Sequence, residues 1–168
     1  MVLHKVNKTT NGENIMKDKA FQEYYPDDYS HCFGCGRLND QGHQIKSYWD
    51  GEESVCHILP DKKYSGGMKD ILYGGLIASL MDCHGAGIAA AAKARELGLE
   101  MKPGCMPRFV TASLKVDYLK PTPVGKEIEL RAEVEEIKGR KVTVSVTLSA
   151  ENIVRAKGQL IMVQIREE

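Results

Sequence analysis

The segment ILYGGLIASLMDCHGAGIAAAAKAREL, residues 71–97, decides the fold. It is the longest apolar run in the chain, it is rich in alanine, and it contains few β-branched residues, a composition that favours a helix over a strand. We expect one helix over residues 74–97, about 36 Å long at roughly 1.5 Å per residue. Gly98 follows as a C-terminal stop, because glycine readily adopts the left-handed backbone that ends many helices.

This expected helix has two different faces. Large apolar residues recur near helical spacing and form one side: Leu76, Ile77, Leu80, Met81 and Ile88. Small residues gather on the other side: Gly75, Ala78, Ser79, Gly85, Ala86 and Ala89. Asp82 lies within this small-residue stripe and almost directly above Gly75, so its carboxylate has room for another molecule to approach.

The start of the helix adds a second feature. Gly74 and Gly75 present backbone N–H groups at the positive end of the helix dipole. A carboxylate can attack a carbonyl, or activate water against it, while such N–H groups hold the carbonyl oxygen. The alternative is that Asp82 is a solvated residue or the partner of a lysine, and that the glycines only permit close packing.

The rest of the chain predicts a sheet. Two strands, 44–50 and 54–59, flank a turn sequence, and four more strands alternate apolar and polar residues at 108–120, 126–137, 140–148 and 153–165. In the first of these four, the alternation puts Val110 on the apolar face and Thr111 on the polar face. We therefore expect an α+β domain in which about six antiparallel strands curve around one long central helix.

Length and composition exclude several classes of protein. The 168 residues suffice for one domain, and the balance of 23 basic and 23 acidic residues indicates neither a nucleic-acid nor a membrane partner. We expect no membrane span, since the helix carries Asp82, His84 and Lys93, and no secretory signal. Because five cysteines cannot all pair within one chain, the cytoplasm is the expected location.

The segment HCFGCGRLNDQGH, residues 31–43, is a glycine-rich loop with a Cys-x-x-Cys pair, Cys32 and Cys35. A tetrahedral zinc site needs a full ligand set, and Cys56 and His57 would complete one only if the fold brought them to the loop. The alternative, which we favour, is a tight turn with two small buried thiols and no metal. A redox role is weaker still, because no helix clearly begins here to lower a thiol pKa.

Three segments resemble hotdog-fold acyl-CoA thioesterases of the PaaI-like and 4HBT-like type. YGGLIASLMD, residues 73–82, is similar to the family's His-Gly-Gly helix start with a later Asp, except that Tyr73 replaces the histidine. CFGCGRLNDQGHQI at 32–45 looks like the loop that leads into this fold, and TASLKVDYLKPTPVGKEI at 111–128 looks like its strand after the helix. The resemblance implies a hotdog domain over residues 31–168. The polar, mixed composition of residues 1–30 predicts an N-terminal extension that is partly helical or frayed.

The resemblance also implies an activity, the hydrolysis of an acyl-CoA thioester to free acid and CoA. The N–H groups of Gly74 and Gly75 would polarise the thioester carbonyl, Asp82 from the helix of a second subunit would act as nucleophile or general base, and Thr111 would assist. Substrate-binding residues are expected at the helix and at basic positions on the sheet edge: Tyr73, Ser79, Lys120, Arg140 and Lys141. No cofactor beyond the CoA of the substrate is expected, and the resemblance implies a homodimer or homotetramer.

Two alternatives follow from departures from the family pattern. Tyr73 does not change charge near neutral pH as histidine does, so a non-catalytic protein that binds acyl-CoA is the second hypothesis. A hydratase relative ranks lower, because those hotdog enzymes carry a histidine five residues after the Asp, and this chain does not. His84 lies about 200° around the helix from Asp82, and we expect it to be packed or at an interface.

Overall fold

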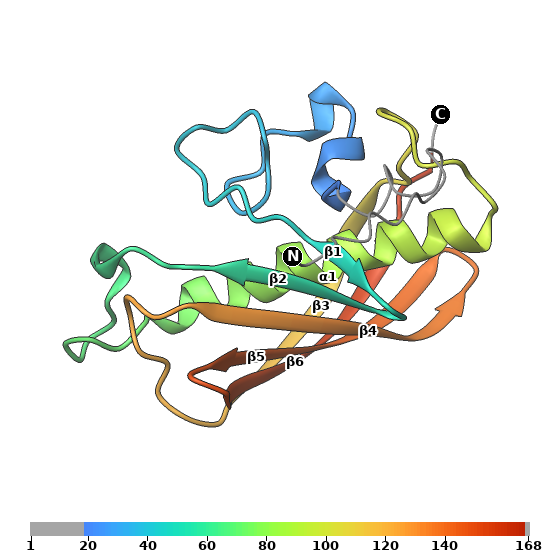
Figure 1. The fold of residues 1–168 in the computed structure, drawn as a ribbon. Helices are drawn as coiled ribbons and strands as arrows, with labels where there is room; N and C mark the ends of the chain where they lie inside the picture. The colour runs from blue at the N-terminus through green and yellow to red at the C-terminus, as the bar shows by residue number, and fades with distance from the viewer. Residues whose placement is uncertain (1–18, 167–168) are drawn as a thin grey trace, which may run out of the picture.

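The computed structural model describes residues 19–166, and within them a six-stranded antiparallel sheet curves around one α-helix, α1 (Gly74–Glu96) (Figure 1). The strand order is β1-β2-β4-β5-β6-β3. The predicted helix and all six strands are confirmed, although the first strand is shorter than expected. The strands are β1 (Tyr48–Asp50), β2 (Glu53–Ile58), β3 (Phe109–Tyr118), β4 (Ile128–Lys138), β5 (Lys141–Ala150) and β6 (Ile153–Gln164).

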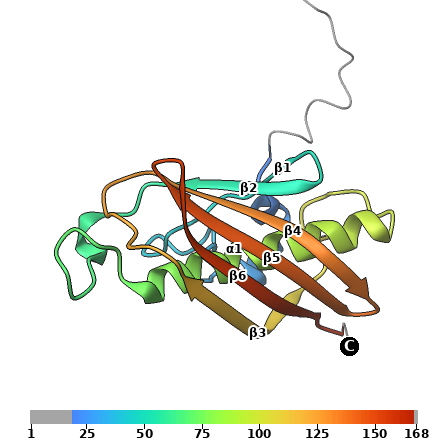
Figure 2. The same ribbon diagram turned by 90° about the horizontal axis from the view of Figure 1, so that it is seen from below.

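The helix α1 forms the centre of the core, and the view from below shows the sheet lying across it (Figure 2). By length and composition α1 could cross a bilayer, which corrects our expectation from its charged residues. However, 67% of its most apolar window is buried inside the fold. The large apolar residues on one side of α1 are all buried: Leu76, Ile77, Leu80, Met81 and Ile88. Burial of each of these side chains stabilises the fold by about 1.5–3 kcal/mol.

Gly98 ends α1 as predicted. Its φ is +64°, its N–H donates to the carbonyl of Arg95 at 3.1 Å, and the N–H of Leu99 donates to the carbonyl of Ala94 at 2.9 Å. These two bonds form a Schellman motif, which satisfies carbonyl groups that the last turn of a helix would leave free.

The segment before the sheet packs on α1. It forms two short 3-10 helices, η1 (Phe21–Tyr24) and η2 (Asp27–Tyr29), and a third, η3 (Lys62–Tyr64), follows β2. Gly87 of α1 makes room for η1, since a Cβ there would lie 3.2 Å from Nε2 of Gln22. The extension was expected to be partly helical or frayed; its described part contains η1 and η2, and residues 1–18 lie outside the described residues.

The strand β3 departs from the regular alternation that the sequence predicts. Its pairing with β6 shifts between Thr111 and Ser113, where a bulge leaves Ala112 without a partner. Val110, expected in the core, is 49% exposed, whereas Phe109 is buried. The assignment of faces at the start of this strand was therefore wrong, and the side chain of Thr111 points toward α1.

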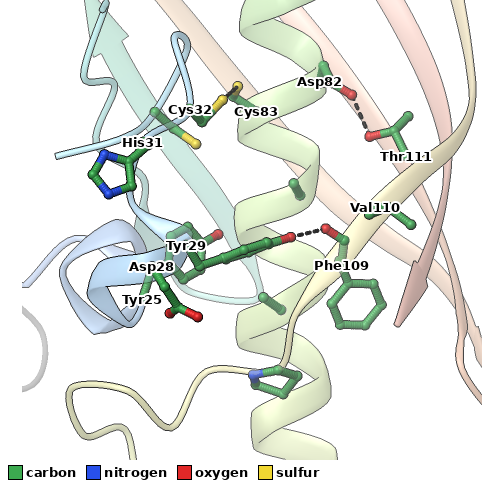
Figure 3. A pocket seen from close by; sticks show the side chains of 14 residues that line it. Tyr25, Asp28, Tyr29, His31, Cys32, Asp82, Cys83, Phe109, Val110 and Thr111 are labelled. Carbon is green, nitrogen blue, oxygen red and sulfur yellow. Dashed lines mark hydrogen bonds between the residues drawn. The ribbon is translucent and has the colours of Figure 1, made fainter. Parts of the chain in front are cut away.

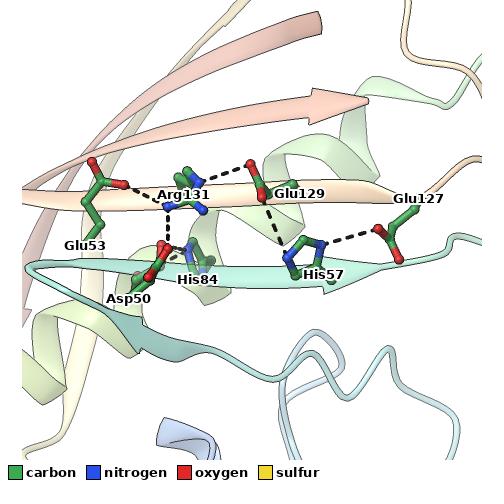
Figure 4. A network of polar contacts seen from close by, with 8 residues as sticks. Asp50, Glu53, His57, His84, Glu127, Glu129 and Arg131 are labelled. Carbon is green, nitrogen blue, oxygen red and sulfur yellow. Dashed lines mark hydrogen bonds and ion pairs between the residues drawn. The ribbon is translucent and has the colours of Figure 1, made fainter. Parts of the chain in front are cut away.

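The outer face of the sheet carries a network of ion pairs (Figure 4). Arg131 on β4 contacts Asp50 at 2.9 Å, Glu53 at 3.1 Å and Glu129 at 3.1 Å. These contacts link β4 to the neighbouring β2 and to the hairpin that joins β2 to β1. Because these side chains are one third to one half exposed, solvent screens the pairs, and each contributes about 1 kcal/mol or less.

His84 lies on the inner side of β2 and is buried, which confirms the packed alternative for this residue. Its Nδ1 lies 2.8 Å from Oγ of Ser47, and its Nε2 lies 3.2 Å from Oγ of Ser54. Burial lowers the pKa of His84 to about 4, so the ring is neutral near neutral pH.

Candidate active site

One side of α1 forms a wall of a pocket of about 390 Å³ (Figure 3). Of the predicted small-residue stripe, Asp82 and Ala86 line this pocket, whereas Ala89 is buried and a Cβ on Gly85 would lie 2.9 Å from Leu160. The helix contributes Asp82, Cys83, Ala86 and Ala90, and the short alanine side chains leave the space open. The other walls come from residues 25–35 and from the start of β3. The volume lies within the roughly 300–1,000 Å³ that is typical of small-molecule sites.

Asp82 is half-buried on this wall, and its Oδ1 accepts a hydrogen bond of 2.5 Å from Oγ1 of Thr111 (Figure 3). The bulge in β3 is the reason that Thr111 faces Asp82, so the structure brings these two predicted residues together. Among the described residues, no group donates a hydrogen bond to Oδ2 of Asp82. One carboxylate oxygen is thus held in place, and the other can act on a bound molecule.

Gly74 and Gly75 begin α1, and Tyr73 precedes them as the N-cap residue without a capping side-chain bond. The ring of Tyr73 lies over Gly75, where a Cβ would be 2.4 Å from it. Tyr118 from the far end of β3 donates a hydrogen bond of 2.9 Å to the carbonyl of Gly74. In the described part of the chain, the N–H groups of Gly74 and Gly75 donate no hydrogen bond, as expected for the first turn of a helix.

These two features are separated along α1. The eight positions from Gly74 to Asp82 correspond to about 12 Å of helix, whereas an oxyanion donor has to lie within about 3 Å of the oxygen that it stabilises. The N–H of Gly74 and the carboxylate of Asp82 in one chain therefore do not reach the same carbonyl group.

The basic residues expected to hold the CoA phosphates do not meet within one chain. Lys120 follows the end of β3 that contacts the helix start. Arg140 and Lys141 lie at the β4–β5 turn, where Lys141 pairs with Val163 and Arg140 donates a hydrogen bond to the carbonyl of Gln164. All three basic residues are exposed, but they lie at opposite ends of the sheet.

A group of three thiols on the pocket wall was missed by the sequence analysis. Cys32 and Cys35 come from the loop and Cys83 comes from α1, and their Sγ atoms all lie within 4.8 Å of one another. Ser79, a predicted substrate-binding residue, is half-buried one turn before Cys83 and faces the same loop, 3.6 Å from where a Cβ of Gly34 would stand. No local sequence pattern links Cys83 to the loop, so the sequence carried no signal for this group.

The fold does not bring Cys56 and His57 to the loop. Cys56 is buried in β2, and the imidazole of His57 lies on the outer side of the sheet, 3.5 Å from Glu127 and 3.7 Å from Glu129 (Figure 4). Cys56 and His57 therefore do not complete a zinc site with Cys32 and Cys35.

Hydrogen bonds within the thiol group separate the pKa values of its members. Contacts of the Cys32 sulfur with the thiols of Cys35 and Cys83 and with nearby backbone N–H groups lower the pKa of Cys32 to about 2. The bond to Cys32 raises the pKa of Cys35 to about 12, and the pKa of Cys83 is raised by the same interactions. Cys32 is therefore the most acidic thiol of the group.

Comparison with known proteins identifies the family of this chain. The model of the Thioesterase superfamily matches residues 69–157. Acyl-coenzyme A thioesterase THEM4 of Rattus norvegicus is 32% identical over 103 residues, which is 61% of this chain and 39% of the rat protein. The match thus spans well under half the length of this relative.

Several solved structures have a similar fold. A thioesterase superfamily protein from Shewanella loihica is 41% identical, with 83% of this chain and 98% of that chain covered and a TM-score of 0.63. The E. coli PaaI protein is 15% identical, with 74% and 81% covered and a TM-score of 0.60. A Streptococcus mutans protein bound to acetyl CoA is 14% identical, with 74% and 90% covered and a TM-score of 0.59. At identities of 14% and 15%, the similarity to the last two structures shows the hotdog fold alone. Because the family model matches more than half of the sequence, this chain belongs to the thioesterase superfamily.

Proposed function

We propose that the protein hydrolyses an acyl-CoA thioester to a free acid and CoA. The observation that carries the proposal is the Asp82 carboxylate, which Thr111 holds on the wall of a pocket in a chain of the thioesterase superfamily. The rat relative named as an acyl-coenzyme A thioesterase supports CoA thioesters as the substrate class. Because a thiolate is a good leaving group, one carboxylate and one oxyanion donor suffice, with Asp82 as nucleophile or general base.

The proposed site requires a second copy of the chain. The N–H of Gly74 and the carboxylate of Asp82 are too far apart in one copy, so we assign them to two copies that face each other. β3 supports such a homodimer, because it lies at the edge of the sheet and most of its residues are exposed. An oxyanion donor at Gly74 would contribute about 3 kcal/mol to transition-state stabilisation.

Several assignments stay predictions alongside this proposal. Further assembly to a tetramer and a cytoplasmic location are among them. The substrate-binding roles of five residues are also predictions, and a second copy of the chain would decide which of them meet at one site: Tyr73, Ser79, Lys120, Arg140 and Lys141.

The test is CoA release from a panel of aryl-, short-chain and long-chain acyl-CoAs, followed by chromatography so that protein thiols do not interfere. Asp82→Asn is expected to lower kcat/KM at least about 100-fold, because the amide cannot act as base or nucleophile. Asp50→Asn is the matched control, since Asp50 is an exposed carboxylate on β1, at the other edge of the sheet, and pairs with Arg131. If the Asp82→Asn protein is folded and hydrolyses its best substrate as fast as wild type, the assignment is wrong.

Tyr73 supports a second candidate, an acyl-CoA-binding protein without turnover. Its ring covers Gly75 at the helix start and is 41% exposed, so it stands where a substrate would approach the N–H groups. Under this alternative, acyl-CoA raises the melting temperature of the protein while no CoA is released. Turnover of any member of the panel excludes it.

A further inference from the structure

Cys32, Cys35 and Cys83 have no role in the proposed hydrolysis, although they line the same pocket as Asp82. They come from two segments that are far apart in the sequence, so the tertiary fold brings the sulfurs together. Gly34 permits this approach, because a Cβ at that position would lie only 2.2 Å from Sγ of Cys83. The loop and the helix are thus shaped around the sulfur of Cys83.

The loop itself is a tight turn that supports negative charge on sulfur. The N–H of Gly36 donates to the carbonyl of Cys32 at 2.8 Å, and a Cβ on Gly36 would lie 2.5 Å from the backbone nitrogen of Cys32. The N–H groups of Gly34 and Cys35 donate to the sulfur of Cys32. Outer hydrogen bonds of this kind orient and stabilise the thiolate ligands of metal ions.

The spacing of the sulfurs fits a bound cation. Two thiolates at about 2.3 Å from a tetrahedral zinc ion stand roughly 3.8 Å apart. The Sγ atoms of Cys32 and Cys83 are 3.7 Å apart, and the third sulfur lies within 4.8 Å of both. A movement of about 1 Å by Cys35 would therefore complete a three-sulfur face for such an ion.

A disulfide is the other use of neighbouring thiols, and the geometry favours it less. A bond between Cys32 and Cys83 would need a sulfur separation of about 2.05 Å. It would also leave Cys35 as a buried third thiol without a partner. A cation uses all three sulfurs in nearly their present positions.

We propose that Cys32, Cys35 and Cys83 form a binding site for one thiophilic divalent cation of the zinc class, with the fourth coordination position open to the pocket. All three residues line the pocket, and Cys32 is exposed whereas the other two are buried, so the fourth ligand is an exchangeable one such as water. The bound ion would fix the loop to α1 beside Asp82. This proposal does not depend on the identity of the reaction.

The test is a titration of the full chain with Co²⁺, after purification with a reductant and removal of metal with a chelator. Thiolate coordination in a tetrahedral site gives Co²⁺ strong visible and near-ultraviolet absorption bands. We expect one Co²⁺ per chain, displaced by Zn²⁺, and a rise in melting temperature on binding. Cys32→Ser and Cys83→Ser are expected to abolish the bands, whereas Cys56→Ser and Cys105→Ser, outside the group, are the matched controls that retain them.

Gly34→Ala is a separate variant that keeps all five thiols. Its Cβ would displace Cys83, so we expect the affinity for Co²⁺ to fall on the order of 10- to 100-fold. If Cys83→Ser fails to fold by circular dichroism, Cys32→Ser and Gly34→Ala decide the question. The proposal is overturned if the wild-type protein shows no absorption bands, or if the bands survive Cys32→Ser.

Discussion

Mild acid is expected to destabilise this fold through one buried side chain, His84. The imidazole is 0% exposed, and its two nitrogens face the hydroxyl groups of Ser47 and Ser54. Burial lowers the pKa of His84 from its ordinary value of 6.5 to about 4, because a charged ring would lose its hydration there. Between these values, the unfolded chain binds a proton that the folded chain does not.

The sign and size of the effect follow from this difference. Because the unfolded state binds more protons, the free energy of unfolding falls as the pH falls below 6.5, and the loss is complete below about pH 4. One unit of pKa corresponds to about 1.36 kcal/mol, so the full loss is about 3 kcal/mol. Over the interval from about pH 7 to about pH 5, the expected loss is about 2 kcal/mol, a large part of the stability of a typical domain.

The measurement is urea unfolding at about pH 7 and about pH 5, at one fixed protein concentration because self-association would add to stability. His84→Gln retains hydrogen-bonding groups toward both serines but does not titrate. Wild type is expected to lose about 2 kcal/mol more than His84→Gln over this interval. Equal losses in wild type and His84→Gln would refute the reasoning.

Two further predictions concern Thr111 and Gly98. Thr111→Val removes the hydroxyl that orients Asp82, so the initial rate of acyl-CoA hydrolysis should fall about 10-fold through the loss of a hydrogen bond to a charged group. Thr111→Ser retains the hydroxyl and should restore the rate. Equal rates for Thr111→Val and wild type would contradict the positioning role of Thr111. Gly98→Ala should lower the urea-unfolding free energy by about 1 kcal/mol, because φ is +64° there and no atom lies within 4 Å of an added Cβ. Gly98→Asn should cost less than Ala, and an alanine variant as stable as wild type would argue against a left-handed residue at the helix end.

The fold could be predicted because its signals are local. The apolar run before Gly98 and the alternation in the later strands each depend on neighbouring residues, and the structure confirms the elements that they indicate. The first strand is shorter than predicted because the chain before it runs beside the loop, where the N–H of Ile45 donates to the carbonyl of Gly34. Such a contact depends on residues that no local pattern links.

The site was only partly predictable for the same reason. The sequence placed Asp82 on an open stripe of the helix, but it assigned Thr111 to the wrong face, because one unpaired residue in a strand leaves no mark in the alternation. It found Cys32 and Cys35 without Cys83, since that sulfur joins them only through the packing of the loop on α1. The proposed cooperation of two copies would likewise depend on geometry between chains.

The unpaired residue Ala112 also determines what a single strand can reach. Thr111 and Tyr118 are an odd number of positions apart, so in an uninterrupted strand their side chains would project from opposite faces. With one extra residue between them, both project toward the helix, one to the acid Asp82 and the other to the carbonyl of Gly74. Deletion of Ala112 would place Thr111 and Tyr118 on opposite faces of β3, so one of the two hydrogen bonds to α1 would be lost. The number of residues in this strand, as much as their identity, therefore allows β3 to contact both the middle and the start of the helix.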